Sequence, residues 1–309
     1  MPQLNILVTG GAGFIASHIV DKYISLGHKV IVLDHNLKNK SYLNPKANYI
    51  EADITNLKIE EIFKNNKIDI INHHAAQIDV AFAETNPQKN AEINIFGTIN
   101  LLNLAKKYNI KKFIFSSSAA LYGNVKQLPV TETTPTNPDS QYGLSKLCAE
   151  KYVFLYHQLY NLDITIFRYA NAYGPRQKGG AIPLFTKNLL QNKQLTIRGD
   201  GAMTRDFVFV EDIAEINAIM LTKKTKSKIF NVSTNTEISM NDVITILSDL
   251  TKLQPKIIKT QLIAGEIINS RLDNTLMKQE LQWQPKTSFK EGLQKTVAAF
   301  KKELKQSGE

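Results

Sequence analysis

The sequence predicts an α/β protein: a doubly wound parallel sheet with a smaller, discontinuous C-terminal lobe. Short apolar runs alternate with amphipathic segments through residues 1–170, and the first run passes straight into a glycine-rich turn. Strand–helix alternation gives a parallel sheet with helices on both faces, and ligands bind at the carboxyl ends of its strands. The expected strands are 4–8, 29–33, 48–51, 69–73, 112–116 and 163–168, and the expected helices are 14–26, 57–65, 88–107 and 142–160.

The glycine-rich turn at residues 9–19 reads TGGAGFIASHI and follows an apolar strand. Gly10 and Gly13 allow a tight turn that brings the backbone close to a pyrophosphate, and Ala16 is small enough for close packing of helix on strand. The following helix N-terminus offers N–H groups to phosphates. These features predict a dinucleotide-binding (Rossmann) site. The alternative is an ordinary glycine turn in an α/β protein.

Asp34 closes the next expected strand. A carboxylate there accepts hydrogen bonds from an adenosine ribose and repels a 2′-phosphate. The residue therefore favours NAD over NADP.

Tyr142 and Lys146 lie four residues apart in QYGLSK and share one face of an expected helix. Serines 116–118 end a strand, so they lie at the carboxyl edge of the same sheet. A lysine cation and an oxidised nicotinamide both favour the phenolate of a nearby tyrosine, which then serves as a base toward an alcohol. The alternative is an exposed helical tyrosine beside a solvated lysine.

Composition narrows the class of protein. The net charge is +10, but the lysines are spread along the chain, so we expect no nucleic-acid or membrane partner. No apolar stretch approaches the ~20 residues of a membrane span, and no signal-type segment precedes the first strand. Cys148 is the one cysteine, which excludes an internal disulfide and a cysteine metal cluster. We expect a cytoplasmic protein in which Cys148 is a buried helical side chain.

The strand–helix pattern loosens after residue 175. Residues 176–205 are rich in Gly, Gln, Lys and Asn, whereas 206–234 recover strand and helix signals and are expected to return to the main sheet. Helices are expected at 239–250 and 285–305. The predicted division is therefore a cofactor-binding domain, 1–175 with 206–238, and a substrate-binding lobe made of 176–205 and 239–309.

Further motifs extend over essentially the whole chain. They are EADI at 51–54, HHAAQIDV at 73–80, NIFGTINLL at 94–102, FSSSAALYG at 115–123, FRYANAYGPRQ at 167–177, GDGAMTRDFVFVEDIA at 199–214 and AGEIINSRLDN at 264–274. With the glycine turn, Asp34 and QYGLSK, they make the chain resemble the extended short-chain dehydrogenase/reductases. The resemblance is to their NAD-dependent nucleotide-sugar epimerase/dehydratase family, and within it to 4-epimerases of UDP-hexoses.

The resemblance implies roles for particular residues. Ser118, Tyr142 and Lys146 would be catalytic. The NAD site would comprise Gly10, Gly13, Phe14, Ile15, Asp34, Asp53, Ile54, Ala75, Ala76, Tyr142 and Lys146. The UDP-sugar substrate would contact Ser118, Asn171, Arg205, Ser270 and Arg271. No metal is implied, and the family's usual homodimer would form through helices 88–107 and 142–160.

The reaction is indicated by Ala119 and Ala120. Dehydratases that the chain resembles have Thr-Asp-Glu across Ser118 and these two positions, and decarboxylases have a glutamate there. Alanine neither donates nor accepts a proton, which favours simple 4-epimerisation through a 4-keto sugar. The alternatives are an epimerase of a UDP-uronic acid or another nucleotide sugar, and a non-catalytic NAD-binding regulator. Such regulators typically lose the tyrosine or lysine, and both are present here.

Three further positions carry expectations. Ile263 stands where relatives often have an arginine, so Arg205 and Arg271 are expected to hold the phosphate charge. Ser270 is expected to leave room beside the sugar's 2-substituent for an acetamido group, although it could equally be a small polar loop residue. The neighbouring His73 and His74 point to opposite faces of a strand and are interpreted as packing residues.

Overall fold

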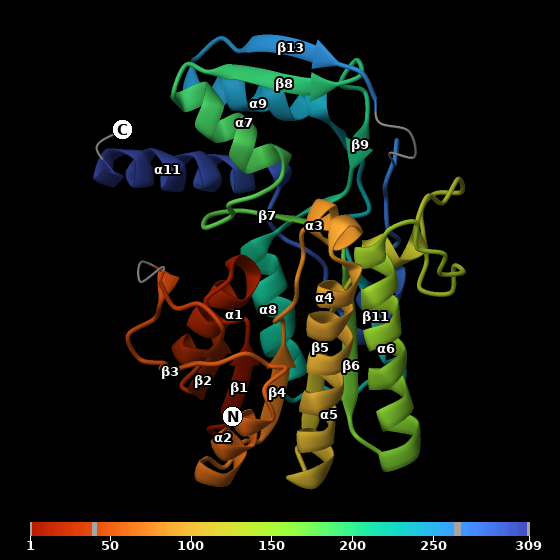
Figure 1. The fold of residues 1–309 in the computed structure, drawn as a ribbon. Helices are drawn as coiled ribbons and strands as arrows, with labels where there is room; N and C mark the ends of the chain where they lie inside the picture. The colour runs from red at the N-terminus through yellow and green to blue at the C-terminus, as the bar shows by residue number, and fades with distance from the viewer. Residues whose placement is uncertain (1, 39–41, 263–266, 308–309) are drawn as a thin grey trace.

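The computed structural model describes residues 2–38, 42–262 and 267–307. Its centre is a seven-stranded sheet in the order β11-β6-β5-β4-β1-β2-β3, in which every neighbouring pair is parallel (Figure 1). The strands are β1 (Asn5–Thr9), β2 (Lys29–Asp34), β3 (Asn48–Glu51), β4 (Ile70–His73), β5 (Lys112–Ser118), β6 (Ile164–Tyr169) and β11 (Ile229–Val232). The predicted fold class is therefore confirmed.

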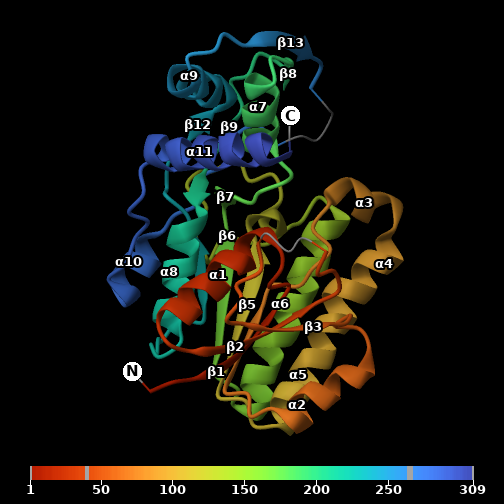
Figure 2. The same ribbon diagram turned by 90° about the vertical axis from the view of Figure 1, so that its left-hand side faces the viewer.

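Both faces of this sheet are covered by helices, and successive side chains of a strand point alternately into the two cores. Ile6 and Val8 of β1 face the core beneath α1 (Phe14–Ser25) and α8 (Val210–Met220). Leu7 points the other way, into the core shared with α2 (Glu60–Asn65), α5 (Gly97–Lys107) and α6 (Gln141–Tyr160). The two groups of helices lie on opposite sides of the sheet (Figure 2).

The expected helix at 88–107 is interrupted in its hydrogen-bond pattern. It begins as α4 (Pro87–Ala91), passes through a π-helical turn, η3 (Glu92–Phe96), and continues as α5. The short helix α3 (Val80–Thr85) precedes it. A short 3-10 turn, η2 (Leu57–Ile59), likewise leads into α2.

A smaller lobe stands above the carboxyl edge of the sheet (Figure 1). It comprises α7 (Ala181–Leu190), β8 (Gln194–Arg198), α9 (Met240–Thr251), β13 (Lys256–Thr260) and α11 (Phe289–Ser307). Strands β8 and β13 pair in parallel, and Leu195, Val243 and Leu293 lie in one separate apolar core.

The expectation that residues 206–234 return to the main sheet is right for one strand and wrong for another. β11 pairs with β6, but β10 (Phe207–Phe209) pairs with β7 (Asn171–Tyr173) in a separate two-stranded sheet. β9 (Thr204–Arg205) pairs with β12 (Ile238–Ser239). α10 (Thr275–Leu281) packs beside β11 and shares the core of α1 and α8. Phe207 and Phe209 instead belong to the core of the lobe, which explains why their strand leaves the main sheet.

Candidate active site

Five strands end side by side at one edge of the sheet. Their last residues are Thr9, Asp34, His73, Ser118 and Tyr169. The parallel register therefore gathers the predicted cofactor and catalytic residues beneath the upper lobe.

The turn after β1 has the shape that a phosphate loop requires. Gly10 has φ +70°, and a Cβ on it would lie 2.7 Å from the backbone nitrogen of Ala75. Gly13 is the N-cap of α1 and brings no side-chain acceptor to that end of the helix. The N–H groups at the start of α1, those of Phe14 and Ile15 included, therefore have no acceptor from the N-cap side chain, and the backbone at Gly10 approaches Ala75 too closely for a Cβ. This end of the fold fits a pyrophosphate.

Two acidic residues flank this turn. The buried Asp34 carboxylate accepts the N–H of Ala12 at 3.0 Å, which ties the end of β2 to the glycine turn. One oxygen of Asp53 accepts both the N–H and the hydroxyl of Thr55 at 2.8 Å. Burial alone would raise the pKa of Asp53. The hydrogen bonds from Thr55 and the more distant charges of Lys89 and His35 lower it by more than burial raises it, so the pKa of Asp53 lies below its ordinary value.

The remaining residues expected near NAD lie on the next two strand ends. Ile54 is buried directly under Gly97, where any larger residue would collide with it. Ala75 and Ala76 are half-buried after β4, and the Ala75 N–H donates to the Thr9 hydroxyl at 3.2 Å. The structure thus brings this whole predicted set to one edge.

Ser118 and Tyr142 come together from different elements. Ser118 ends β5, and its hydroxyl accepts the N–H of Ala120 at 3.2 Å at the start of η4 (Ala119–Tyr122). The Ser140 hydroxyl caps α6 at 3.1 Å. This cap starts the helix in the register that places the Tyr142 phenol in hydrogen-bond contact with Ser118. Lys146 follows one turn later, with its Nζ 4.4 Å from the centre of the Phe115 ring.

Burial controls the ionisation of this pair. It raises the pKa of the Tyr142 phenol, against the Ser118 hydrogen bond, which lowers it. Burial also lowers the pKa of Lys146 to about 7, and the Glu150 carboxylate acts in the opposite direction. In the protein alone the cost of burying a phenolate dominates the pKa of Tyr142, and the predicted effect of the Lys146 cation and the oxidised nicotinamide on this phenol stays a prediction.

A buried ion pair that the sequence did not reveal lies behind these residues. The Nε and Nη2 atoms of Arg168 on β6 donate hydrogen bonds to the two carboxylate oxygens of Glu150 on α6, and the Nε–Oε2 distance is 3.1 Å. The Ser117 hydroxyl donates to Glu150 at 2.7 Å, and Arg168 donates to the Tyr122 hydroxyl at 2.8 Å. This network joins β5, η4, α6 and β6 around Ser118. The one hint of this network in the sequence is the spacing of Glu150, which lies four residues after Lys146 and so on the same face of the helix.

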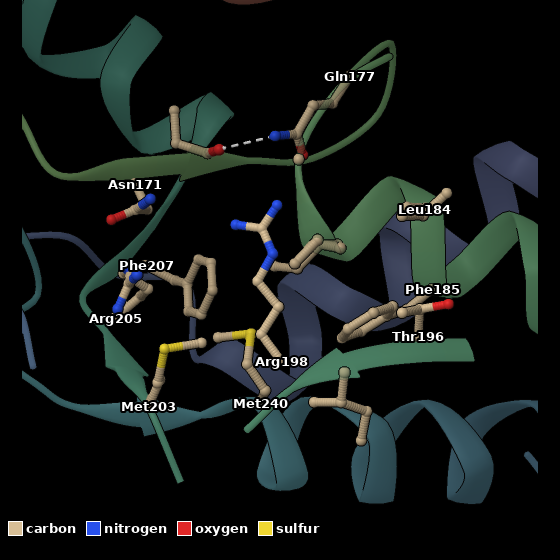
Figure 3. Close-up of a pocket in the computed structure, with 15 residues that line it drawn as sticks. Asn171, Gln177, Leu184, Phe185, Thr196, Arg198, Met203, Arg205, Phe207 and Met240 are labelled. Atoms are coloured by element: carbon tan, nitrogen blue, oxygen red, sulfur yellow. Dashed lines mark hydrogen bonds between the residues drawn. The ribbon is translucent and has the colours of Figure 1, made fainter. Parts of the chain in front are cut away.

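Two cavities open above the strand ends. The inner cavity, about 180 Å³, begins at Ser118, Ala119 and Ala120 and includes Ser270. The outer cavity, about 470 Å³, lies under the upper lobe (Figure 3). Asn171 and Arg205 line both cavities, so they mark where the two meet.

Arg271 lies between Ser270 and Leu272, which line the inner cavity, and its predicted contact with the substrate stays a prediction. It does not belong to the lining of either cavity among the described residues, and its Nε lies 3.8 Å from a Glu237 carboxylate oxygen. The prediction about Ile263 falls outside the described residues.

The two histidines lie among side chains of the sheet. The two ring nitrogens of His73 contact the hydroxyls of Thr9 at 2.7 Å and Thr98 at 2.9 Å. The His74 ring stacks on Tyr169, and burial, together with the Lys146 cation, lowers the pKa of His74 to about 3. Within the described part of the chain, no three His, Cys, Asp or Glu side chains gather as a metal site. Cys148 is half-buried rather than buried.

A parallel sheet with a glycine-capped helix and an acidic strand end at one edge is the architecture of a dinucleotide-binding enzyme. The chain belongs to the NAD dependent epimerase/dehydratase family, whose family model matches residues 6–233. It is thus a member of an enzyme family that uses NAD. In the described residues, no helix is long and apolar enough to cross a membrane.

Several relatives are similar over nearly their whole length. A putative UDP-glucose 4-epimerase of Methanocaldococcus jannaschii is 42% identical over 94% of this chain and 97% of its own. The crystal structure of a Thermotoga maritima UDP-glucose 4-epimerase with UDP-glucose matches with a TM-score of 0.94 at 38% identity, over 97% and 100% of the two chains. The structure of a UDP-N-acetylglucosamine 4-epimerase of Methanobrevibacter ruminantium, in complex with UDP-N-acetylmuramic acid, matches with a TM-score of 0.92 at 31% sequence identity. The match covers 98% of this chain and 100% of the other. Dehydratases and decarboxylases are also similar, at 32% and 30% identity.

Proposed function

We propose that this enzyme interconverts UDP-hexoses that differ in configuration at C4, such as UDP-glucose and UDP-galactose. The observation that carries the proposal is the pairing of Ser118 and Tyr142 beside Ala119 and Ala120. The pair supplies proton transfer to one alcohol. No carboxylate is among the described residues that line the inner cavity, so an elimination of water would lack its own acid and base there.

The chemistry assigned to the chain is a proton transfer run twice. The Tyr142 phenolate accepts the proton of the sugar's 4-hydroxyl, with Ser118 hydrogen-bonded to the same oxygen, and it returns that proton when the alcohol reforms. NAD, held at the glycine turn and Asp34, would supply a reversible acceptor for the C4 hydride, so that the 4-hydroxyl can reform in either configuration. Lys146, one helical turn after Tyr142, would contact the nicotinamide ribose and, when protonated, would favour the phenolate.

The cofactor contacts follow from the strand edge. The pyrophosphate is assigned to the α1 N-terminus after Gly10 and Gly13, at the N–H groups of Phe14 and Ile15. The adenosine ribose is assigned to Asp34. Asp53, Ile54, Ala75 and Ala76 are assigned to the adenine and nicotinamide sides of the groove.

For the substrate, the sugar is assigned to the inner cavity and the diphosphate to the junction at Asn171 and Arg205. Ser270 lines the inner cavity and is much smaller than an aromatic residue, which supports acceptance of a 2-acetamido sugar. Arg271 contributes only if it leaves Glu237.

The direct test is incubation of the purified enzyme with a panel of UDP-sugars, followed by separation of the C4 epimers. We expect UDP-galactose from UDP-glucose, and UDP-N-acetylgalactosamine from UDP-N-acetylglucosamine. Release of a dehydrated or decarboxylated product in place of an epimer would contradict the proposal.

We also propose a homodimer formed through the helical segment 88–107, which comprises α4, η3 and α5, and through α6. Its support is an exposed apolar face: Phe96 is 67% exposed and Leu159 is 61%, and Leu144, Leu155 and Tyr160 are exposed along the same helices. Light scattering should give twice the chain mass. Leu159→Glu should give the mass of one chain, because it places a charge within that face.

The division into domains is proposed as 1–175 with 206–238 for NAD, and 176–205 with 239–309 for the substrate. The pairing of β11 with β6 and the separate core of the upper lobe support it. Within 239–309, α10 is the segment that packs on the sheet.

A further inference from the structure

Each phosphate of a bound diphosphate can be held by an arginine through two parallel N–H donors. A nucleoside diphosphate sugar has a negative charge on each of its two phosphates. Among the described residues, Arg205 is the one lysine or arginine that lines the inner cavity, and Arg271 lies near Glu237 instead. Arg198 is the other lysine or arginine among the described residues that line the two cavities.

Arg198 lines the outer cavity together with Arg205. It is the last residue of β8, a strand anchored in the lobe by the buried Leu195 and Ile197. Arg198 itself is exposed, as Thr196 is, so the alternation along the strand directs both side chains away from that core. Figure 3 shows the Arg198 side chain running from its strand across the cavity, toward the side where Asn171 and Gln177 lie.

The outer cavity around Arg198 has an apolar part, which suits a base, and a polar end, which suits a phosphate. Much of the outer cavity is apolar, with Phe185, Met203, Phe207 and Met240 in its lining, and suits a flat base. Its polar end is where Asn171 and Arg205 meet the inner cavity. A guanidinium that reaches toward that end meets the phosphate nearer the nucleoside, which it can bind through two parallel N–H donors.

We propose that Arg198 binds the nucleoside-proximal phosphate of the substrate and so determines affinity for the nucleotide half without taking part in the chemistry. This inference rests on the proposed function, since it takes the substrate to be a nucleoside diphosphate sugar. It gives the chain two arginines for two phosphates, Arg205 at the sugar side and Arg198 at the nucleoside side.

The test is calorimetric titration of the NAD-bound enzyme with UDP and CDP, for wild type, Arg198→Met and Arg198→Lys. Lys256→Met on the neighbouring strand β13 is the matched control, because it removes one exposed cation outside both cavities. Because Arg198→Met loses a charged hydrogen bond, its affinity for UDP and for CDP should fall by ~10- to 100-fold, and the affinity of Arg198→Lys should fall less. The ratio of UDP to CDP affinity should stay unchanged, and Lys256→Met should bind as wild type.

Steady-state kinetics complete the test. Arg198→Met should raise KM for UDP-glucose and leave kcat near wild type. Wild-type affinity for both nucleotides in Arg198→Met would overturn the inference, and so would a changed preference between UDP and CDP, because it would place Arg198 on the base. Failure of the wild-type enzyme to bind UDP at all would instead refute the proposed substrate, so the two failures are distinguishable.

Discussion

The buried ion pair between Glu150 and Arg168 gives the most structure-dependent prediction. Both side chains are almost fully buried, at 3% and 5% exposure, and Arg168 holds the carboxylate through two nitrogens. Glu150→Gln keeps the shape but leaves the Arg168 cation without its counter-ion. Removing one partner of a buried pair costs ~3–5 kcal/mol. For 309 residues the entropy of unfolding is roughly 0.65 kcal/mol/K, so each kcal/mol lowers Tm by about 1.5 °C and we expect a loss of roughly 5–8 °C.

The assay is thermal unfolding of wild type, Glu150→Gln and the double variant Glu150→Gln/Arg168→Met. The double variant removes both charges and keeps Tyr122 hydrogen-bonded to Asn231, so it should be more stable than Glu150→Gln alone. Since Glu150 raises the pKa of Lys146, the single variant should also move the lysine's titration in the pH profile of kcat/KM to lower pH. A Tm within ~1 °C of wild type, or a double variant that is worse than the single one, would refute the reasoning.

Further predictions concern the cofactor, the base and the sugar pocket. Tyr142→Phe should lower kcat by ~10²–10⁴-fold while NAD still co-purifies, whereas near wild-type turnover would exclude the phenol as the base. Acid extracts of the protein should contain NAD(H), because Asp34 opposes a 2′-phosphate; a predominance of NADP(H) would contradict this. Ser270→Tyr should reduce the rate on UDP-N-acetylglucosamine selectively, and equal losses on UDP-glucose would remove Ser270 from this role. For Lys146, burial lowers the pKa to about 7, below the ~10.4 of an unfolded lysine, so the unfolded chain binds more protons between these values. The stability of the cofactor-free enzyme should therefore rise over that pH window in wild type and not in Lys146→Met, as read from Tm at each pH.

Local sequence patterns were sufficient for much of the fold. The glycine turn, the strand ending at Asp34 and the helix containing QYGLSK depend on periodicity and short spacings, and they appear within two residues of the expected bounds. The rule that parallel strands end at one edge placed serines 116–118 near Tyr142 and Lys146, and the choice of Ser118 as the catalytic serine came from the family resemblance.

Features that depend on tertiary contacts could not be predicted from the sequence. Arg168 reads as one residue of an apolar strand, and only the packing of α6 on β6 brings it to Glu150. The partner of β10 was misjudged because both candidate sheets accept an apolar strand. The proximity of Arg271 to Glu237 likewise depends on packing between segments that are distant in the sequence. The pKa of Tyr142 depends on burial, which the spacing of a tyrosine and a lysine does not report.

The measurement that tests the central claim most directly is the reaction of UDP-glucose labelled with deuterium at C4. If Tyr142 moves the proton while the C4 hydride goes out and returns within one active site, the UDP-galactose formed keeps its deuterium at C4 and takes up no solvent hydrogen there. Loss of the label to solvent, accumulation of a 4-keto product, or loss of water from the sugar would contradict the account.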